Sequence, residues 1–245
     1  MESNDATSLR LGLTCGLLAS AARLVPVPFL DDLLREKALQ ILVSRTLQAQ
    51  GRSYPSKEVA PLYGDPTGCL QGCFVGAFTV LLKLALFPIK KFLIWVMAAK
   101  WLARDLSEAL LLGRVLERVL GSGQLSAEAE IGPRREEATR IRRAFDNALA
   151  GTDMVLLRGT LVGAARSVSG LPRAAMAAVR KLRGRSEDSS ADPTDGLNVR
   201  QQATMDEGTK KLTAALESDD MVAFLAAFDA RFDENLAILE KRGRE

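Results

Sequence analysis

Few side chains in this sequence are suited to chemistry. It contains no histidine, and its only thiols are Cys15, Cys69 and Cys73. The absence of histidine removes the usual general base near neutral pH and the commonest metal ligand. The cysteines lie in apolar runs, and Cys69 and Cys73 have the i, i+4 spacing of a helix rather than the C-x-x-C spacing of a redox motif, so we interpret all three as packing residues.

The carboxylates offer no better candidate for a reactive site. Asp31 and Asp32 form an adjacent acidic pair that could hold a metal ion, but they stand where the N-cap of a helix is expected. Nucleotide-binding and nucleophile motifs are missing from the sequence. We therefore predict a protein that is not an enzyme, with no catalytic residue, no metal ion and no cofactor. The alternative is an enzyme of unfamiliar chemistry that uses carboxylates, lysines or one of the three cysteines.

The composition favours helices. Hydrophobic residues make up 47% of the 245 residues and aromatic residues 5%, and leucine and alanine are abundant. Such a mixture favours helix over sheet. We predict an all-α fold, a multi-helix assembly with apolar, glycine-zipper-like helices and a C-terminal amphipathic helical pair. The 33 basic and 30 acidic residues are too balanced to predict a nucleic-acid partner.

Breaker residues and polar stretches divide the chain into three predicted parts. Residues 1–182 form a helical membrane-associated domain, 183–206 a disordered linker, and 207–245 the C-terminal amphipathic helices. The linker is predicted because its polar, turn-rich composition cannot bury a core. Within the first part we predict two apolar helices and three amphipathic ones, at 9–25 and 68–120 and at 31–50, 133–150 and 153–182.

Glycines recur every four residues at three places in the predicted helices. In lipid, such spacing lets two helix backbones approach closely and associate by packing. The alternative is that alanine- and glycine-rich helices produce the spacing by chance, or pack closely in a soluble bundle. The glycines are Gly12 and Gly16, then Gly68, Gly72 and Gly76, then Gly159 and Gly163.

The region 68–88 is the most apolar, yet it is marginal as a membrane span. About ten Leu, Val and Phe side chains favour insertion by about 0.3 to 0.6 kcal/mol each, whereas a central Lys83 opposes it by about 2.5 to 3.5 kcal/mol. We predict shallow insertion, with Phe74 and Phe78 in the apolar layer. Lys83, Lys90 and Lys91 then reach lipid headgroups through their long stems.

The predicted helix 153–182 is basic on one face. On a helical wheel its arginines fall within about 80° of one another, opposite an aliphatic face, as in a helix that lies on anionic lipid. The alternative is a core-facing helix with a solvated arginine face, and Pro172 could disturb the register. Nucleic acid is disfavoured because no aromatic residue accompanies the cations. The predicted headgroup-binding arginines are Arg158, Arg166, Arg173 and Arg180.

The start of the chain resembles a known family. The run Gly12-Leu13-Thr14-Cys15-Gly16, followed by Pro26-Val27-Pro28-Phe29-Leu30-Asp31-Asp32, resembles EcsC-type proteins and the helical membrane hairpins attached to some bacterial GTPases. No GTPase motif is present. The resemblance implies a membrane-associated helical protein and transfers no functional residues.

We therefore expect a bacterial-type, membrane-associated helical protein that faces the cytoplasm and acts as an adaptor or membrane-remodelling factor. Residues 9–25 and 68–103 would insert, the arginines would contact an anionic lipid surface, and the C-terminal helices would bind a protein partner or a second copy in a homo-oligomer. The alternative is a soluble helical bundle that acts as a protein-interaction module or oligomer, because short apolar runs are typical of core helices.

Overall fold

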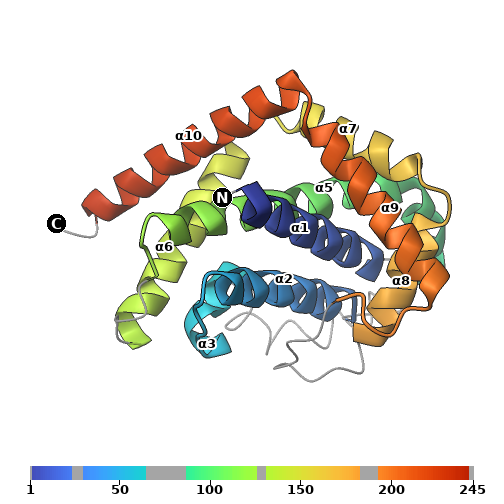
Figure 1. Ribbon diagram of the computed structural model, residues 1–245, viewed down its shortest axis with the longest axis horizontal. Coiled ribbons are helices and arrows are strands. Elements are labelled where there is room, and N and C mark those ends of the chain that lie inside the picture. The colour runs from blue at the N-terminus through green and yellow to red at the C-terminus, as the bar shows by residue number, and fades with distance from the viewer. Residues whose placement is uncertain (1, 24–29, 65–86, 126–130, 183–192, 243–245) are drawn as a thin grey trace.

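The structure is a computed structural model, and it describes residues 2–23, 30–64, 87–125, 131–182 and 193–242. Every regular element in these ranges is a helix, which confirms the all-α prediction (Figure 1). The helices are α1 (Glu2–Ala22), α2 (Leu30–Ala49), α3 (Ser56–Val59), the 3-10 helix η1 (Ala60–Leu62), α5 (Phe87–Gly121), α6 (Ile131–Ala150), α7 (Val155–Arg166), α8 (Leu171–Leu182), α9 (Val199–Leu216) and α10 (Asp219–Arg242).

Helix α1 packs closely on α5 through its two glycines. A Cβ atom placed on Gly16 would lie 2.9 Å from the Leu106 Cα and 3.2 Å from the Ala109 Cβ. A Cβ atom on Gly12 would lie 3.4 Å from the Ala109 carbonyl oxygen. Such distances leave no room for a side chain at Gly16, so the bare backbone sets the separation of the two helices. The pairing occurs between two helices of the same chain.

The apolar residues of α1 are buried in this arrangement. Leu13, Cys15 and Leu18 are fully buried, and they belong to a hydrophobic core that includes residues from α1 through α10. The predicted apolar helix 9–25 ends at Ala22, and its described part lies within the fold. By length and composition, no single helix among the described residues could cross a membrane. The segments Gly132–Ala150 and Val155–Arg166 are long and apolar enough when taken together, but the chain bends by 91° between them.

One predicted helix is divided in two, and another is described only in part. The described part of the apolar helix expected at 68–120 is α5, which runs from Phe87 to Gly121. Residues 65–86 lie outside the described residues. The helix expected at 153–182 is two helices, α7 and α8, because the chain turns at Gly170, whose φ of +84° interrupts the helix.

The predicted linker 183–206 is wrong in its second half. Helix α9 begins at Val199, where the Asn198 side chain accepts from the Gln201 backbone N–H and the Gln201 side chain accepts from the Asn198 N–H. This reciprocal pair is a capping box, which satisfies two backbone donors that a helix start would otherwise expose. The Thr204 hydroxyl donates to the Arg200 carbonyl oxygen, as in a helix interior.

The C-terminal helices pack on different parts of the molecule. Helix α9 lies against α7 and α8, whereas α10 lies along α6 on the outside of the molecule and pairs with α5 through Asp229 and Asp233 (Figure 1). The rings of Phe145 on α6 and Phe228 on α10 meet edge to face, with centroids 6.1 Å apart. Both helices are amphipathic, as predicted, and both bury their apolar residues in the common core.

Candidate functional site on helices α7 and α8

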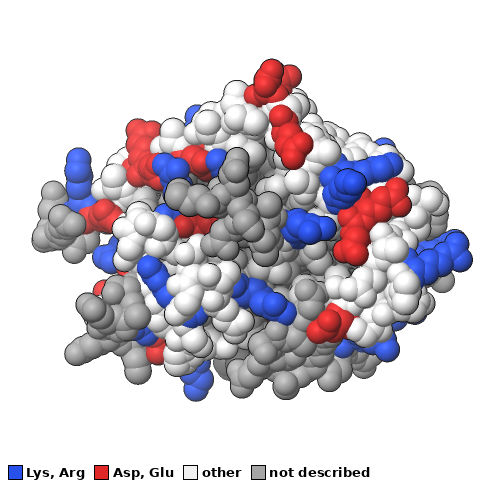
Figure 2. Space-filling view, in the orientation of Figure 1, with Lys and Arg blue, Asp and Glu red and all other residues white. Residues whose placement is uncertain are grey.

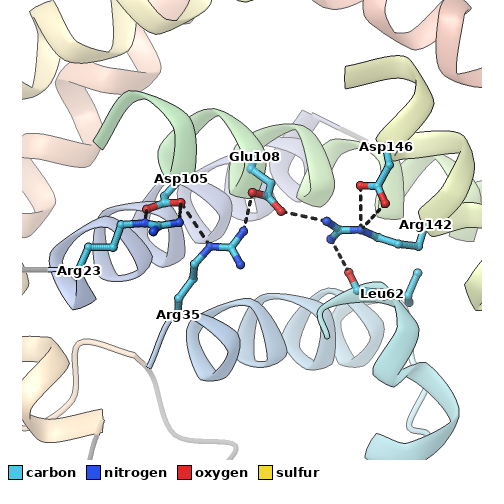
Figure 3. A network of polar contacts seen from close by, with 7 residues as sticks. All are labelled: Arg23, Arg35, Leu62, Asp105, Glu108, Arg142 and Asp146. Atoms are coloured by element: carbon cyan, nitrogen blue, oxygen red, sulfur yellow. Dashed lines mark hydrogen bonds and ion pairs between the residues drawn. The ribbon is translucent and has the colours of Figure 1, made fainter. Parts of the chain in front are cut away.

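Charged groups occur in two contrasting settings in this molecule, and the first is a buried network around α5 (Figure 3). The Asp105 side chain is 0% exposed, and it accepts from Arg23 Nε at 2.5 Å and from Arg35 Nε at 3.3 Å. Arg23 follows the end of α1 and Arg35 lies on α2, so Asp105 joins three helices. One buried carboxylate thus accepts hydrogen bonds from two guanidinium groups that are distant in the sequence.

Glu108 continues the network one turn further along α5. It accepts from Arg35 Nη2 at 2.5 Å and from Arg142 Nη2 at 3.0 Å. Arg142 of α6 also donates to the Leu62 carbonyl oxygen at 3.1 Å and pairs with Asp146. Burial by itself raises the pKa of Glu108, but the charges and hydrogen bonds of Arg35 and Arg142 outweigh it and hold the pKa below its ordinary value.

This network joins helices within the fold. Glu108 is ionised at neutral pH, and each of its two oxygens accepts a hydrogen bond from a guanidinium group. Burial opposes the charge of Arg35, yet Glu108 and Asp105 raise its pKa. Glu108 and Arg35 therefore have no proton to exchange near neutral pH. In the part of the chain that the structure describes, no three His, Cys, Asp or Glu side chains converge.

This network was not predicted from the sequence. Asp105 and Glu108 are two acids in the midst of a run of buried aliphatic residues, and a buried acid requires a partner. The presence of these two acids within a buried aliphatic run is the feature of the sequence that indicates such a network. The partners themselves lie 34 to 82 residues away in the sequence, so spacing alone does not identify them.

The second setting is the surface of α7 and α8, where the predicted headgroup-binding arginines lie. Residues 154–182 contain five basic side chains and no acidic one. All five are exposed, and none pairs with a carboxylate of the described residues. The basic residues are Arg158 and Arg166 on α7, and Arg173, Arg180 and Lys181 on α8.

The two helices present these cations on separate segments. The break at Gly170 means that the single wheel drawn for 153–182 does not apply, and each helix has its own exposed face. On α8, the aliphatic face is buried and Arg173, Arg180 and Lys181 face outward. In Figure 2, blue side chains project at the right-hand edge of the molecule, in the region where Figure 1 places α8 and α9.

Helix α7 also exposes apolar and small residues beside its arginines. Val155 is 74% exposed and Leu156 is 46% exposed. Gly159 and Gly163 face outward, and a Cβ atom on either would meet nothing within 4 Å. These two glycines thus differ from Gly12 and Gly16, because they contact no other helix of the described chain.

The remaining predicted site residues lie at or beyond the edge of the described structure. Lys90 and Lys91 belong to the first turns of α5. The rest lie outside the described residues, namely Gly68, Gly72, Gly76, Phe74, Phe78 and Lys83, as do Cys69 and Cys73. Insertion of the region 68–86 stays a prediction.

Comparison with known proteins gives no relative. No protein-family model, no curated protein and no solved structure matches the chain. The resemblance to EcsC-type proteins and GTPase-associated hairpins stays a prediction.

Proposed function

We propose that this protein is a non-enzymatic adaptor that binds the anionic surface of a membrane, on its cytoplasmic side, through α7 and α8. The observation that carries the proposal is the run 154–182, in which five exposed cations stand without a single acidic neighbour in sequence. The arginines of the buried network, Arg23, Arg35 and Arg142, are instead paired with carboxylates. Exposed cations without acidic partners favour an anionic partner.

The expected binding energy is modest and depends on salt. A cation near an anionic bilayer contributes about 1 kcal/mol, so the five together contribute at most about 5 kcal/mol, roughly a 10³- to 10⁴-fold preference for the surface. Val155 and Leu156 sit beside the arginines and supply apolar area that can enter the headgroup layer. Because α1 is part of the core, this mode of binding leaves the fold intact.

A vesicle sedimentation experiment tests the proposal. The protein is mixed with vesicles of phosphatidylcholine alone or with added phosphatidylglycerol, and the bound fraction is measured as the salt concentration rises. We expect binding to the anionic vesicles alone, and release as the screening length falls below about 8 Å. Failure to sediment with the anionic vesicles at low salt would overturn the proposal.

A charge-matched pair of variants identifies the surface. Replacing four arginines of α7 and α8 by glutamine removes about 4 kcal/mol of attraction, roughly a 10³-fold loss of vesicle affinity. The control replaces four exposed cations that lie elsewhere and causes the same change in net charge. Equal losses in both variants would show that net charge, rather than this surface, drives binding. The test positions are Arg158, Arg166, Arg173 and Arg180, and the control positions are Arg135, Arg143, Lys210 and Lys241.

A further inference from the structure

We propose that the hollow between the start of α8 and the start of α9 binds a phosphate monoester. The inference rests on the proposed function, because this hollow belongs to the same basic surface, and it names the chemical group that the surface would select. The hollow has a volume of about 600 Å³, and none of its lining residues is acidic. It is lined by Ser169, Gly170, Pro172, Arg173, Ala174, Arg200, Gln201 and Thr204.

The local sequence explains why these residues meet. The turn at Gly170 ends α7 and starts α8, which places Arg173 in the first turn of α8. The capping box at Asn198 starts α9, which places Arg200 in the first turn of that helix. Two arginines from different helices therefore line one hollow.

A close contact fixes the two helices against each other. A Cβ atom on Gly208 of α9 would lie 2.5 Å from Leu171 Cδ1 of α8, so the leucine side chain occupies the space over the bare glycine. Leu171 is buried, and it precedes Arg173 by two residues. The position of Arg173 relative to α9 is thus set by core packing and does not depend on a ligand.

The two guanidinium groups are available to a ligand. Neither Arg173 nor Arg200 forms an ion pair with a carboxylate of the described residues, and both are exposed. Thr204 and Gln201 are already engaged, through the Arg200 carbonyl oxygen and the capping box respectively. The arginines are therefore the groups that would bind a ligand, because each offers a planar fork of N–H donors.

The charge of the site matches a monoester better than a diester or a carboxylate. A phosphate monoester carries about −1.5 to −2 charges at neutral pH, which two guanidinium groups neutralise. A diester or a carboxylate carries a single negative charge and leaves one arginine without a counterpart. Bidentate hydrogen bonds from arginine also fit the oxygens of a terminal phosphate.

A second cavity of the described chain does not have this character. It lies between α1, α2, α5 and α9, with a volume of about 520 Å³. Its lining includes Arg10 and Arg45 but also Glu117 and Asp206, so its charges are mixed. An anion is not favoured there, whereas the acid-free hollow at α8 and α9 favours one.

The monoester could belong to a lipid headgroup or to a soluble phosphorylated molecule, and the experiment separates the two. The lipid arm compares vesicles that contain phosphatidic acid, a monoester, with vesicles that contain phosphatidylglycerol, a diester, at matched zeta potential. The soluble arm titrates glycerol 3-phosphate into the protein by calorimetry, with sodium chloride at the same ionic strength as a reference. In the lipid arm, we expect phosphatidic acid to be bound about tenfold more tightly, because charge-assisted bidentate bonds add to the surface attraction.

Two double variants with the same change in charge locate the effect. Arg173→Gln with Arg200→Gln should abolish the preference for phosphatidic acid. Arg158→Gln with Arg166→Gln, on α7, should weaken binding to both lipids equally and keep the preference. Circular dichroism on both variants establishes that they are folded.

Each result decides a different question. Equal affinity for the two anionic lipids, together with no heat from glycerol 3-phosphate, overturns the phosphate site and leaves the proposed membrane function standing. No binding to any anionic vesicle, together with glycerol 3-phosphate binding that requires Arg173 and Arg200, overturns the membrane function and assigns the hollow to a soluble phosphate. A preference that survives in the Arg173 and Arg200 double variant also overturns the site.

Discussion

The arginines around α5 and the arginines of α7 and α8 differ in whether a carboxylate of the same chain pairs with them. Around α5, Arg23, Arg35 and Arg142 are partly buried and each contacts a carboxylate on another helix. On α7 and α8, residues 154–182 have exposed arginines and no acid. An arginine whose charge is neutralised within the fold fixes helices in place, whereas one left without a counterpart is available to another molecule. The contrast predicts which substitutions change stability and which change binding.

The largest effect is expected at Asp105. Replacement by asparagine removes the charge that Arg23 and Arg35 share while both guanidinium groups remain in place. Breaking a buried ion pair by removing one partner costs about 3 to 5 kcal/mol. Urea denaturation of the Asp105→Asn variant should show this decrease in the free energy of unfolding.

Asp146 provides the control for that substitution. It also pairs with an arginine of the network, Arg142, but its side chain is 45% exposed. Exposed pairs contribute about 0 to 1 kcal/mol, so Asp146→Asn should change stability little. If the two variants were equally stable, burial would not be what makes the network important.

The next effect compares two glycines with the same spacing motif. At Gly16 a Cβ atom would lie 2.9 Å from the Leu106 Cα, and this backbone atom cannot give way locally. Gly16→Ala should therefore destabilise the protein by about 1 to 3 kcal/mol through overpacking. At Gly163 nothing lies within 4 Å, so Gly163→Ala should stabilise it by about 0.5 to 1 kcal/mol, as alanine does in an exposed helix. Thermal and urea denaturation measure both, and a loss of stability at Gly163 would contradict the outward placement of that face.

Acid should weaken the buried network and leave the basic surface charged. The pKa of Glu108 is lowered below its ordinary value of 4.5, so the unfolded state binds more protons in this range. The stabilisation is present above pH 4.5 and is lost as the pH falls through the lower, folded-state pKa, at about 1.4 kcal/mol for each unit of lowering. The free energy of unfolding of wild type should therefore fall more steeply below pH 4.5 than that of Glu108→Gln. Parallel pH profiles would show that Glu108 is not stabilised by its partners.

The sequence predicts the fold better than it predicts the details that position the charges. The all-α class and the helices expected at 31–50 and 133–150 agree with α2 and α6 to within two residues at each end, because the apolar period and the flanking breakers are local signals. The break in 153–182 lies at residues 167–170, where α7 has ended and Gly170 has a positive φ, just ahead of Pro172. A helical wheel assumes one continuous helix and does not reveal such a break.

The start of α9 and the α5 network were missed for different physical reasons. The first turns of α9 are polar, and a capping box together with the contact between Gly208 and Leu171 stabilises them, so the apolar pattern gave no sign of a helix there. The α5 network needs partners from α1, α2 and α6, which only the folded chain brings together. The predicted arginines of α7 and α8 could be identified because an acid-free stretch is visible in the sequence itself.

The smallest effect on stability is expected where the effect on binding is largest. Exposed substitutions away from packed or paired groups change stability by about 0.5 kcal/mol or less. The variant with glutamine at Arg158, Arg166, Arg173 and Arg180 should therefore unfold at the same urea concentration as wild type, because these side chains contribute neither to the core nor to a described ion pair. The same protein should lose its attachment to anionic vesicles. A marked loss of stability would mean that these arginines help to hold the fold together, and the distinction between the two sets of arginines would then fail. Unchanged stability with lost binding would show that their charge binds an external anion.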